Sequence, residues 1–199
     1  MALFPSPFSK GYWRAAVREL KDLRKLTFAA LMIAACLILN KFKLPLGESL
    51  SLSITFLARA LCAAVCGPVV SIVFGAAEDT LGFFLGNSSG PYFPGYMITT
   101  ITGCIIYALF FYRARITVWR IIFAKLITNV QNVLLGSLWS AMLYSKGYIY
   151  YMTTSAWKNL LYLPVQILLL VWLLQSLLPM MHRLHWSPCQ LEGDRIPWR

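Results

Sequence analysis

Acidic residues are scarce in this chain: Asp and Glu together number 7 among 199 residues, against 18 Lys and Arg. Charged residues make up only 13% of the sequence, about half the share of an ordinary soluble domain, while 59% is hydrophobic. The few charges lie in short polar breaks between long apolar runs, which is typical of an integral membrane protein. The net charge of +11 comes largely from Lys and Arg that flank apolar segments and act as topology signals. We therefore expect no nucleic-acid binding.

The usual signatures of an enzyme are also missing. The chain has no Gly-Lys dipeptide, so it has no phosphate-binding P-loop, and we expect no ATP hydrolysis by this chain. It has no H-E-x-x-H motif, and its histidines, His182 and His185, lie in the C-terminal tail. GNSSG (86–90) matches G-x-S-x-G, but no histidine is expected on that side of the membrane to activate its serine. Cys62 and Cys66 lack a second pair of metal ligands, so we expect no metal site. Together with the missing motifs, this predicts no cofactor and no catalytic residue.

A basic stretch precedes the apolar part of the chain. Residues 11–25 carry cations at spacings of four, three and four residues on one helical face, and Trp13, Val17 and Leu20 mark another face. This pattern predicts an amphipathic helix on an anionic membrane surface, with a solvated basic segment as the alternative. We therefore take residues 1–25 as a basic amphipathic N-terminal segment.

Six apolar segments follow and predict an all-α membrane protein with six transmembrane helices. They lie near residues 26–40, 53–66, 69–86, 95–112, 118–143 and 159–179. The second is short for a hydrocarbon core that needs about 20 helical residues, and it fits best if a tight turn at Gly67-Pro68 joins it to the third. Clustered Lys and Arg place both termini in the cytoplasm. The helices form one domain, 26–179, followed by a cytoplasmic tail, 180–199.

Aromatic residues gather on the predicted outer side of the membrane. Three connections lie there, at residues 41–52, 87–95 and 144–158. The middle one runs into GPYFPGYM (90–97), where two prolines restrict the backbone around Tyr92, Phe93 and Tyr96. Trp139 falls on the same side. An aromatic belt at the membrane interface and a stacking platform for a flat heterocycle both remain open interpretations.

Polar residues inside the apolar segments are candidate binding residues. Glu78 and Asp79 lie in the third segment, and Asn129 and Asn132 share one face of the fifth. A charged residue at the centre of a membrane costs about 2.5–3.5 kcal/mol on insertion scales, so such residues usually face a cavity. The alternatives are a solvated position near the outer interface for the carboxylates and hydrogen bonding between helices for the amides.

Two further groups are defined by charge and by size. Lys43, Arg59 and Lys158 fall in or near the outward half, where clustered positive charge would attract an anionic ligand, although long cationic side chains can also snorkel to the interface. Ala30 and Ala34 are four residues apart in the first apolar segment. Small residues at this spacing let two membrane helices approach closely.

Three stretches carry a resemblance to a known family. They are LTFAALMIAACLIL (26–39), CGPVVSIVFGAAEDTLGFFL (66–85) and GPYFPGYMITTITGCIIYALFFYR (90–113). The chain resembles, over residues 26–178, the substrate-binding S components of energy-coupling factor (ECF) vitamin transporters, and most closely the folate-specific ones. The resemblance implies a bacterial cytoplasmic membrane protein that is not an enzyme. Such a protein captures folate at the outer face and works with a transmembrane T component and two ATPase subunits on other chains.

The resemblance also implies roles for the candidate residues. Asp79, with Glu78 second, would accept hydrogen bonds from the donor-rich edge of the pterin ring. The glutamate tail of folate would suit the cations Lys158, Lys43 or Arg59. The aromatic residues of the 90–97 stretch would form a lid over the bound vitamin. Ala30 and Ala34 would form the face of this chain that docks to the T component. Riboflavin, pantothenate or another vitamin, and a membrane assembly protein without transport function, are the alternative interpretations.

Overall fold

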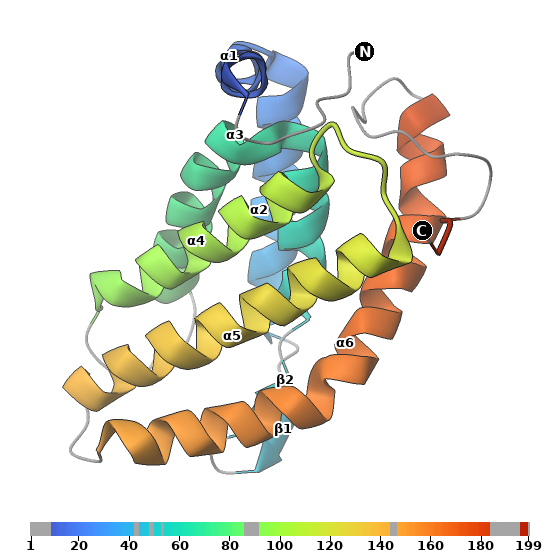
Figure 1. Cartoon of the computed structure of the whole chain (residues 1–199). Coiled ribbons are helices and arrows are strands. Elements are labelled where there is room, and N and C mark those ends of the chain that lie inside the picture. The colour runs from blue at the N-terminus through green and yellow to red at the C-terminus, as the bar shows by residue number, and fades with distance from the viewer. Residues whose placement is uncertain are drawn as a thin grey trace.

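The computed structural model describes residues 9–41, 44–47, 50–52, 54–85, 92–143, 147–183 and 196–198. Within these ranges the chain forms six helices and one two-stranded sheet (Figure 1). The elements are α1 (Lys10–Glu19), α2 (Leu23–Lys41), β1 (Leu44–Gly47), β2 (Leu50–Leu52), α3 (Thr55–Leu85), α4 (Pro94–Phe111), α5 (Val118–Leu143) and α6 (Tyr148–Arg183). All helices except α1 are long and apolar enough to cross a membrane. The predicted helical membrane architecture is therefore confirmed, while the count of six crossings and the side of the termini stay predictions.

Helix α3 is a hairpin of two helical segments. At Gly67 the backbone leaves the helical region, with φ 79° and ψ 177°, and Pro68 starts the second segment. Arg59 Nη2 and Glu78 Oε2 are 2.9 Å apart across this turn. In a straight helix the two residues would be about 28 Å apart along the axis, so the segments run back alongside each other. The tight turn expected at Gly67-Pro68 thus joins the second and third apolar segments within one element.

The tight turn at Gly67 is also covered by a side chain from another helix. A Cβ atom at position 67 would lie 2.8 Å from Cε2 of Tyr112, which follows α4. The positive φ and this close approach both favour glycine at the position. The turn and the end of α4 therefore pack directly on each other.

The predicted outer connections contain more regular structure than the sequence indicated. β1 and β2 pair antiparallel, with Leu44 opposite Leu52, inside the first connection, so the purely helical prediction lacked this hairpin. α4 begins at Pro94, a favourable residue in a first helical turn, which places half of the 90–97 stretch inside a helix. α6 begins at Tyr148, inside the third connection. Hydropathy did not predict this part of the helix, because it is too polar to stand out as an apolar segment.

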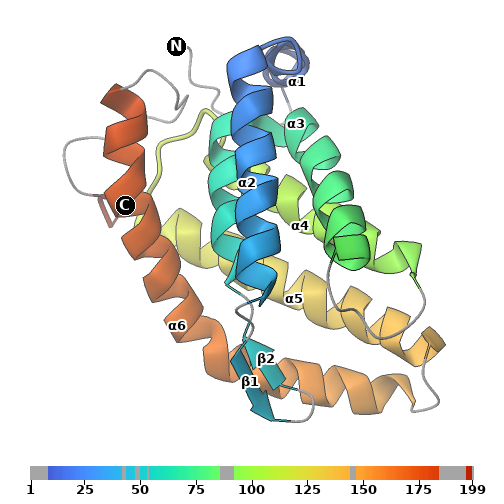
Figure 2. The same ribbon diagram turned by 180° about the vertical axis from the view of Figure 1, so that it is seen from behind.

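The helices pack in two groups, one built on the hairpin of α3 and one formed by α5 and α6. Contacts between α2 and α3 and between α3 and α4 dominate one side, and α5 packs against both α4 and α6 (Figure 2). The first segment of α3 carries small buried residues, including Ala60, Ala63 and Ala64, which allow close helix approach in a membrane. α6 bends along its length in both views, and Pro164 inside it interrupts the helical hydrogen bonding. α1 lies at one end of the bundle and the β1–β2 hairpin at the other.

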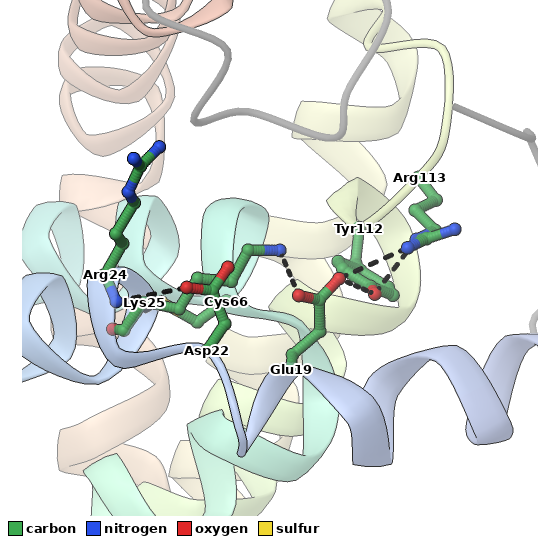
Figure 3. A network of polar contacts seen from close by, with 7 residues as sticks. All are labelled: Glu19, Asp22, Arg24, Lys25, Cys66, Tyr112 and Arg113. Atoms are coloured by element: carbon green, nitrogen blue, oxygen red, sulfur yellow. Dashed lines mark hydrogen bonds and ion pairs between the residues drawn. The ribbon is translucent and has the colours of Figure 1, made fainter.

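Helix α1 is fixed to the bundle by the carboxylate of Glu19. Tyr112 Oη donates to Glu19 Oε1 at 2.8 Å, Arg113 Nη2 donates to the same oxygen at 3.2 Å, and Lys25 pairs with Oε2 (Figure 3). Tyr12 of α1 is buried beside these groups and donates to the carbonyl oxygen of Ala108 at 3.1 Å. The buried side of α1 is thus bonded to α2 and to the end of α4, while Trp13, Val17 and most of its cations stay exposed.

The environment of Glu19 also sets its titration. Burial alone would raise the pKa of this carboxyl, but hydrogen bonds from Lys25, Tyr112 and Arg113, with the charge of Lys25, together lower the pKa below its ordinary value. A lowered pKa means that the ionised carboxylate stabilises the fold above the ordinary Glu pKa. This contribution is lost as the pH falls through the lowered value.

We expect Glu19→Gln to lower the free energy of unfolding by about 1.5–3 kcal/mol, because hydrogen bonds to a charged group are lost and Lys25 and Arg113 lose the carboxylate of Glu19. The measurement is thermal unfolding in detergent. Asp22→Asn is the control, since the Asp22 carboxylate accepts only from the exposed N–H of Arg24 at 3.1 Å and asparagine caps a helix equally well. A melting temperature for Glu19→Gln equal to that of the Asp22→Asn control would contradict the assigned role of Glu19.

Candidate functional site

A cavity of about 400 Å³ lies between the ends of several helices. Asn40 at the end of α2, Thr55 at the start of α3, Tyr96 at the start of α4 and Ser140 near the end of α5 all line it. These helix ends adjoin the three connections that the sequence places on the outer side. Side chains of α5 and α6 form the long wall of the cavity. Its position fits a binding site that is reached from the predicted outer face.

The α5 wall is built by residues at helical spacing. Lys125, Asn129, Asn132, Gly136 and Ser140 follow each other at intervals of four, three, four and four residues, so they share one face of the helix. From Lys125 to Ser140 this face extends about 22 Å at the rise of an α-helix. Lys125 and Asn129 are buried, and Asn132 is exposed in the cavity. The cavity therefore has a buried end at Lys125 and a more open end toward Ser140.

Amide groups from α5 and α6 meet in the cavity wall. Asn129 Nδ2 donates to Gln166 Oε1 at 3.1 Å, and both residues line the cavity together with Asn159 and Tyr162 of α6. An amide side chain offers both donors and acceptors, so a wall of this kind can match a heterocycle whose edge alternates the two. The hydrogen bond between Asn129 and Gln166 also fixes α6 against α5.

Three cations line the cavity, and one of them is paired with a buried carboxylate. Arg59 Nη2 lies 2.9 Å from both carboxylate oxygens of Glu78, whose side chain is 1% exposed. Lys158 is half-buried on α6, and Lys125 is buried on α5. Glu78 balances the charge of Arg59, and the described residues that line the cavity include three cations and no carboxylate.

Aromatic residues at the start of α4 support the open end of the cavity. Tyr96 lines it, and its hydroxyl is 3.2 Å from Ser140 Oγ. Phe93 packs on Trp139 with ring centroids 5.6 Å apart, and Trp139 Nε1 donates to Thr99 Oγ1 at 2.9 Å. These contacts connect α4 with α5 beside the cavity.

Gly95 makes this aromatic packing possible. A Cβ atom at position 95 would lie 2.6 Å from Cδ2 of Trp139, so any larger residue would push the tryptophan away from the start of α4. The backbone of α4 therefore passes directly under the Trp139 ring.

The structure brings some of the predicted site residues together and leaves others apart. Arg59, Tyr96, Asn129, Asn132 and Lys158 all line the cavity. Phe93 and Trp139 lie next to it, as described above. Tyr92 instead stacks on Phe84 with centroids 6.1 Å apart. Lys43 lies outside the described residues.

The two predicted carboxylates do not line this cavity. Glu78 is buried behind Arg59, while Asp79 accepts a hydrogen bond from Thr100 Oγ1 at 3.2 Å and so connects α3 to α4. Adjacent helical residues point about 100° apart, which explains why the two face different neighbours. Ala30 and Ala34 are exposed on α2, away from the cavity lining.

Sequence reasoning missed Lys125, Asn159, Tyr162 and Gln166. Lys125 could have been found, because it is a charged residue inside a predicted span, which is the signal that selected Glu78. It also continues the helical spacing of Asn129. Asn159, Tyr162 and Gln166 recur at three and four residues on α6, but amides and tyrosine at that spacing are too common to select without the structure.

No metal site appears among the residues that the structure describes: no group of three or more His, Cys, Asp or Glu side chains there could hold a metal ion. The side chains that line the cavity offer hydrogen-bond donors and acceptors, cations and aromatic rings to a ligand. The site is suited to binding a polar, partly aromatic molecule with an anionic part.

Comparison with known families settles the class of protein. The family model for the ECF transporter, substrate-specific component, matches residues 24–174. The chain belongs to this family. The family resemblance predicted from the sequence is therefore confirmed, and the ECF S component is a multi-pass membrane protein of a transport system. The matched range includes the whole cavity wall of α5 and α6 and excludes α1.

Individual relatives of this S component are folate transporters. The folate transporter FolT of Clostridium novyi is 25% identical over 147 residues, covering 73% of this chain and 85% of that protein. FolT of Leuconostoc mesenteroides is 28% identical over 154 residues, covering 73% and 82%. The crystal structure of FolT bound with folic acid matches with a TM-score of 0.69 at 25% identity, covering 76% of this chain and 92% of that one. The predicted likeness to folate-specific S components is confirmed.

Proposed function

We propose that this ECF S component binds folate in the cavity between α3, α4, α5 and α6. The observation that carries the proposal is the structural match to FolT bound with folic acid, which extends over three quarters of the chain. The cavity supports it independently, since a volume of about 400 Å³ lies within the range of small-molecule sites.

The chemistry of the cavity is complementary to the two ends of folate. The pterin ring presents donors and acceptors along one edge, which the amides Asn129, Asn159 and Gln166 can satisfy. The ring is flat, and Tyr96 and Tyr162 offer faces for stacking. The glutamate tail is a dianion, and Lys158 and Arg59 supply positive charge. Asp79 bonds to Thr100 outside this cavity, so we assign the pterin-facing role to the amides.

The family implies how captured folate is moved. We propose that the chain works in a bacterial cell membrane with a transmembrane T component and two ATPase subunits, which supply the energy. Ala30 and Ala34 are exposed on α2 and would allow a partner helix to approach closely. Their role in docking follows from the resemblance and is tested separately below.

A calorimetric titration of the purified chain in detergent tests the proposal. We expect saturable binding of folate at one molecule per chain, and no comparable heat from thiamine, riboflavin or pantothenate. Thiamine is the matched control for charge, because it is a cation and the described lining of the cavity contains cations and no carboxylate. Binding of riboflavin or pantothenate in place of folate would keep the family and overturn the choice of vitamin.

A further inference from the structure

Lys125 is a buried cation in an unusual position for a membrane protein. It lies in the 26-residue helix α5, its exposed fraction is 4%, and it lines the cavity at the buried end. Its Nζ lies 4.1 Å from the ring centroid of Phe56 and donates to Tyr107 Oη at 3.4 Å. Both contacts are weak compared with an ion pair, because a cation–π contact and a long bond to a neutral hydroxyl replace only part of the hydration that burial removes.

Carboxylates do not compensate this charge within the part of the chain that the structure describes. Three ion pairs are formed there, by Lys25 and Arg113 with Glu19 and by Arg59 with Glu78, and none includes Lys125. Glu78 is committed to Arg59. The buried end of the cavity therefore holds a cation without a carboxylate of its own.

Such a residue is costly for the empty protein. An unpaired charge inside a membrane helix costs several kcal/mol, and an apolar side chain of the same length would avoid that cost. Methionine would fill nearly the same volume beside Phe56 and Tyr107. Fold stability therefore gives no reason for a lysine at this position, whereas a ligand with an anionic or strongly accepting group does.

We propose that Lys125 is a specificity-determining residue, which donates a charge-assisted hydrogen bond to an acceptor group of the ligand at the buried end of the cavity. The assignment rests on the proposed function. The acceptor is a carboxylate of the glutamate tail or the carbonyl oxygen of the pterin ring. An ammonium group has three donors, and only one of them is taken by Tyr107.

The test compares Lys125→Met with the unaltered chain in folate titration and in thermal unfolding without ligand. We expect folate affinity to fall about 10- to 150-fold, as when one charge-assisted hydrogen bond is lost. The melting temperature of the ligand-free variant should stay equal or rise, because the uncompensated charge is removed. Loss of affinity together with retained stability distinguishes a ligand contact from a structural role.

Lys41→Met is the matched control, because Lys41 is an exposed cation that donates to the carbonyl oxygen of Leu85 and does not line the cavity. It should change neither folate affinity nor the selectivity of the site. If Lys125→Met does not fold, Lys125→Gln carries the same comparison, because it keeps a donor and removes the charge. Folate affinity equal to that of the unaltered chain in the folded variant would overturn the assignment.

A second ligand identifies the acceptor group. With 6-methylpterin, which has no glutamate tail, Lys125→Met should reduce binding if the lysine contacts the ring and leave it unchanged if the lysine contacts a carboxylate. Either outcome supports the assignment when folate affinity falls. Failure of the unaltered chain to bind folate would instead overturn the proposed function, and this assignment with it.

Discussion

Arg59→Met should lower the free energy of unfolding by about 3 kcal/mol, because it leaves the carboxylate of Glu78 buried without its cation. Removing one partner of a fully buried ion pair costs about 3–5 kcal/mol, and the lower end applies here since 28% of the Arg59 side chain is exposed. The Glu78 side chain is only 1% exposed, so solvent cannot take the place of the arginine. Chemical denaturation in detergent measures the loss.

A second substitution separates the ion pair from the binding function of Arg59. In the Arg59→Met/Glu78→Met variant both charges are removed, and most of the lost stability should return, because well-packed apolar residues often replace a buried pair without loss. Folate affinity should remain low in both variants if Arg59 also attracts the glutamate tail. Arg14→Met, on the exposed face of α1, is the control. Stability that falls further in the double variant would show that the pair is not the cause.

Ala30→Trp and Ala34→Trp should each abolish folate uptake by cells while leaving folate affinity unchanged. Both alanines are exposed on α2 and outside the cavity, so an indole there blocks close approach of a partner helix without touching the ligand. The measurements are uptake of labelled folate, co-purification with the T component and ATPase subunits, and titration of the purified variants.

Val130→Trp is the control for added bulk, because Val130 is 49% exposed on a different helix, α5. It should support uptake at the level of the unaltered chain. Normal uptake by the Ala30→Trp and Ala34→Trp variants would place the docking face elsewhere on the protein, and weakened folate binding would show that the substitutions distort the cavity.

Hydropathy alone predicted the positions of the apolar helices well. The expected 118–143 segment is α5 with the same bounds, and the 95–112 segment differs from α4 by one residue at each end. The predicted turn at Gly67 is where α3 reverses. These features are local: an apolar run predicts a membrane helix, and a glycine before a proline predicts a turn, from neighbouring residues alone.

The pairing of Arg59 with Glu78 could not be predicted in the same way. The pairing depends on how the two segments of α3 pack after the reversal. No sequence pattern around either residue identifies the other as its partner. The start of α6, residues 148–158, was missed because its tyrosines, threonines and Lys158 lower the hydropathy of this part below that of a membrane span. The position of Asp79 outside the cavity likewise follows from helix rotation, which hydropathy does not determine.

The Glu19 contacts also define how much of the chain is needed to make one stable unit. The family match begins at residue 24, but α1 ends at Glu19, whose carboxylate is shared by Lys25, Tyr112 and Arg113. A chain that starts at the family boundary would leave Lys25 and Arg113 without that carboxylate. It would also expose the surface, including Tyr112, on which Tyr12 packs. We therefore expect the folding unit of this S component to include α1, whose ten residues lie outside the family match.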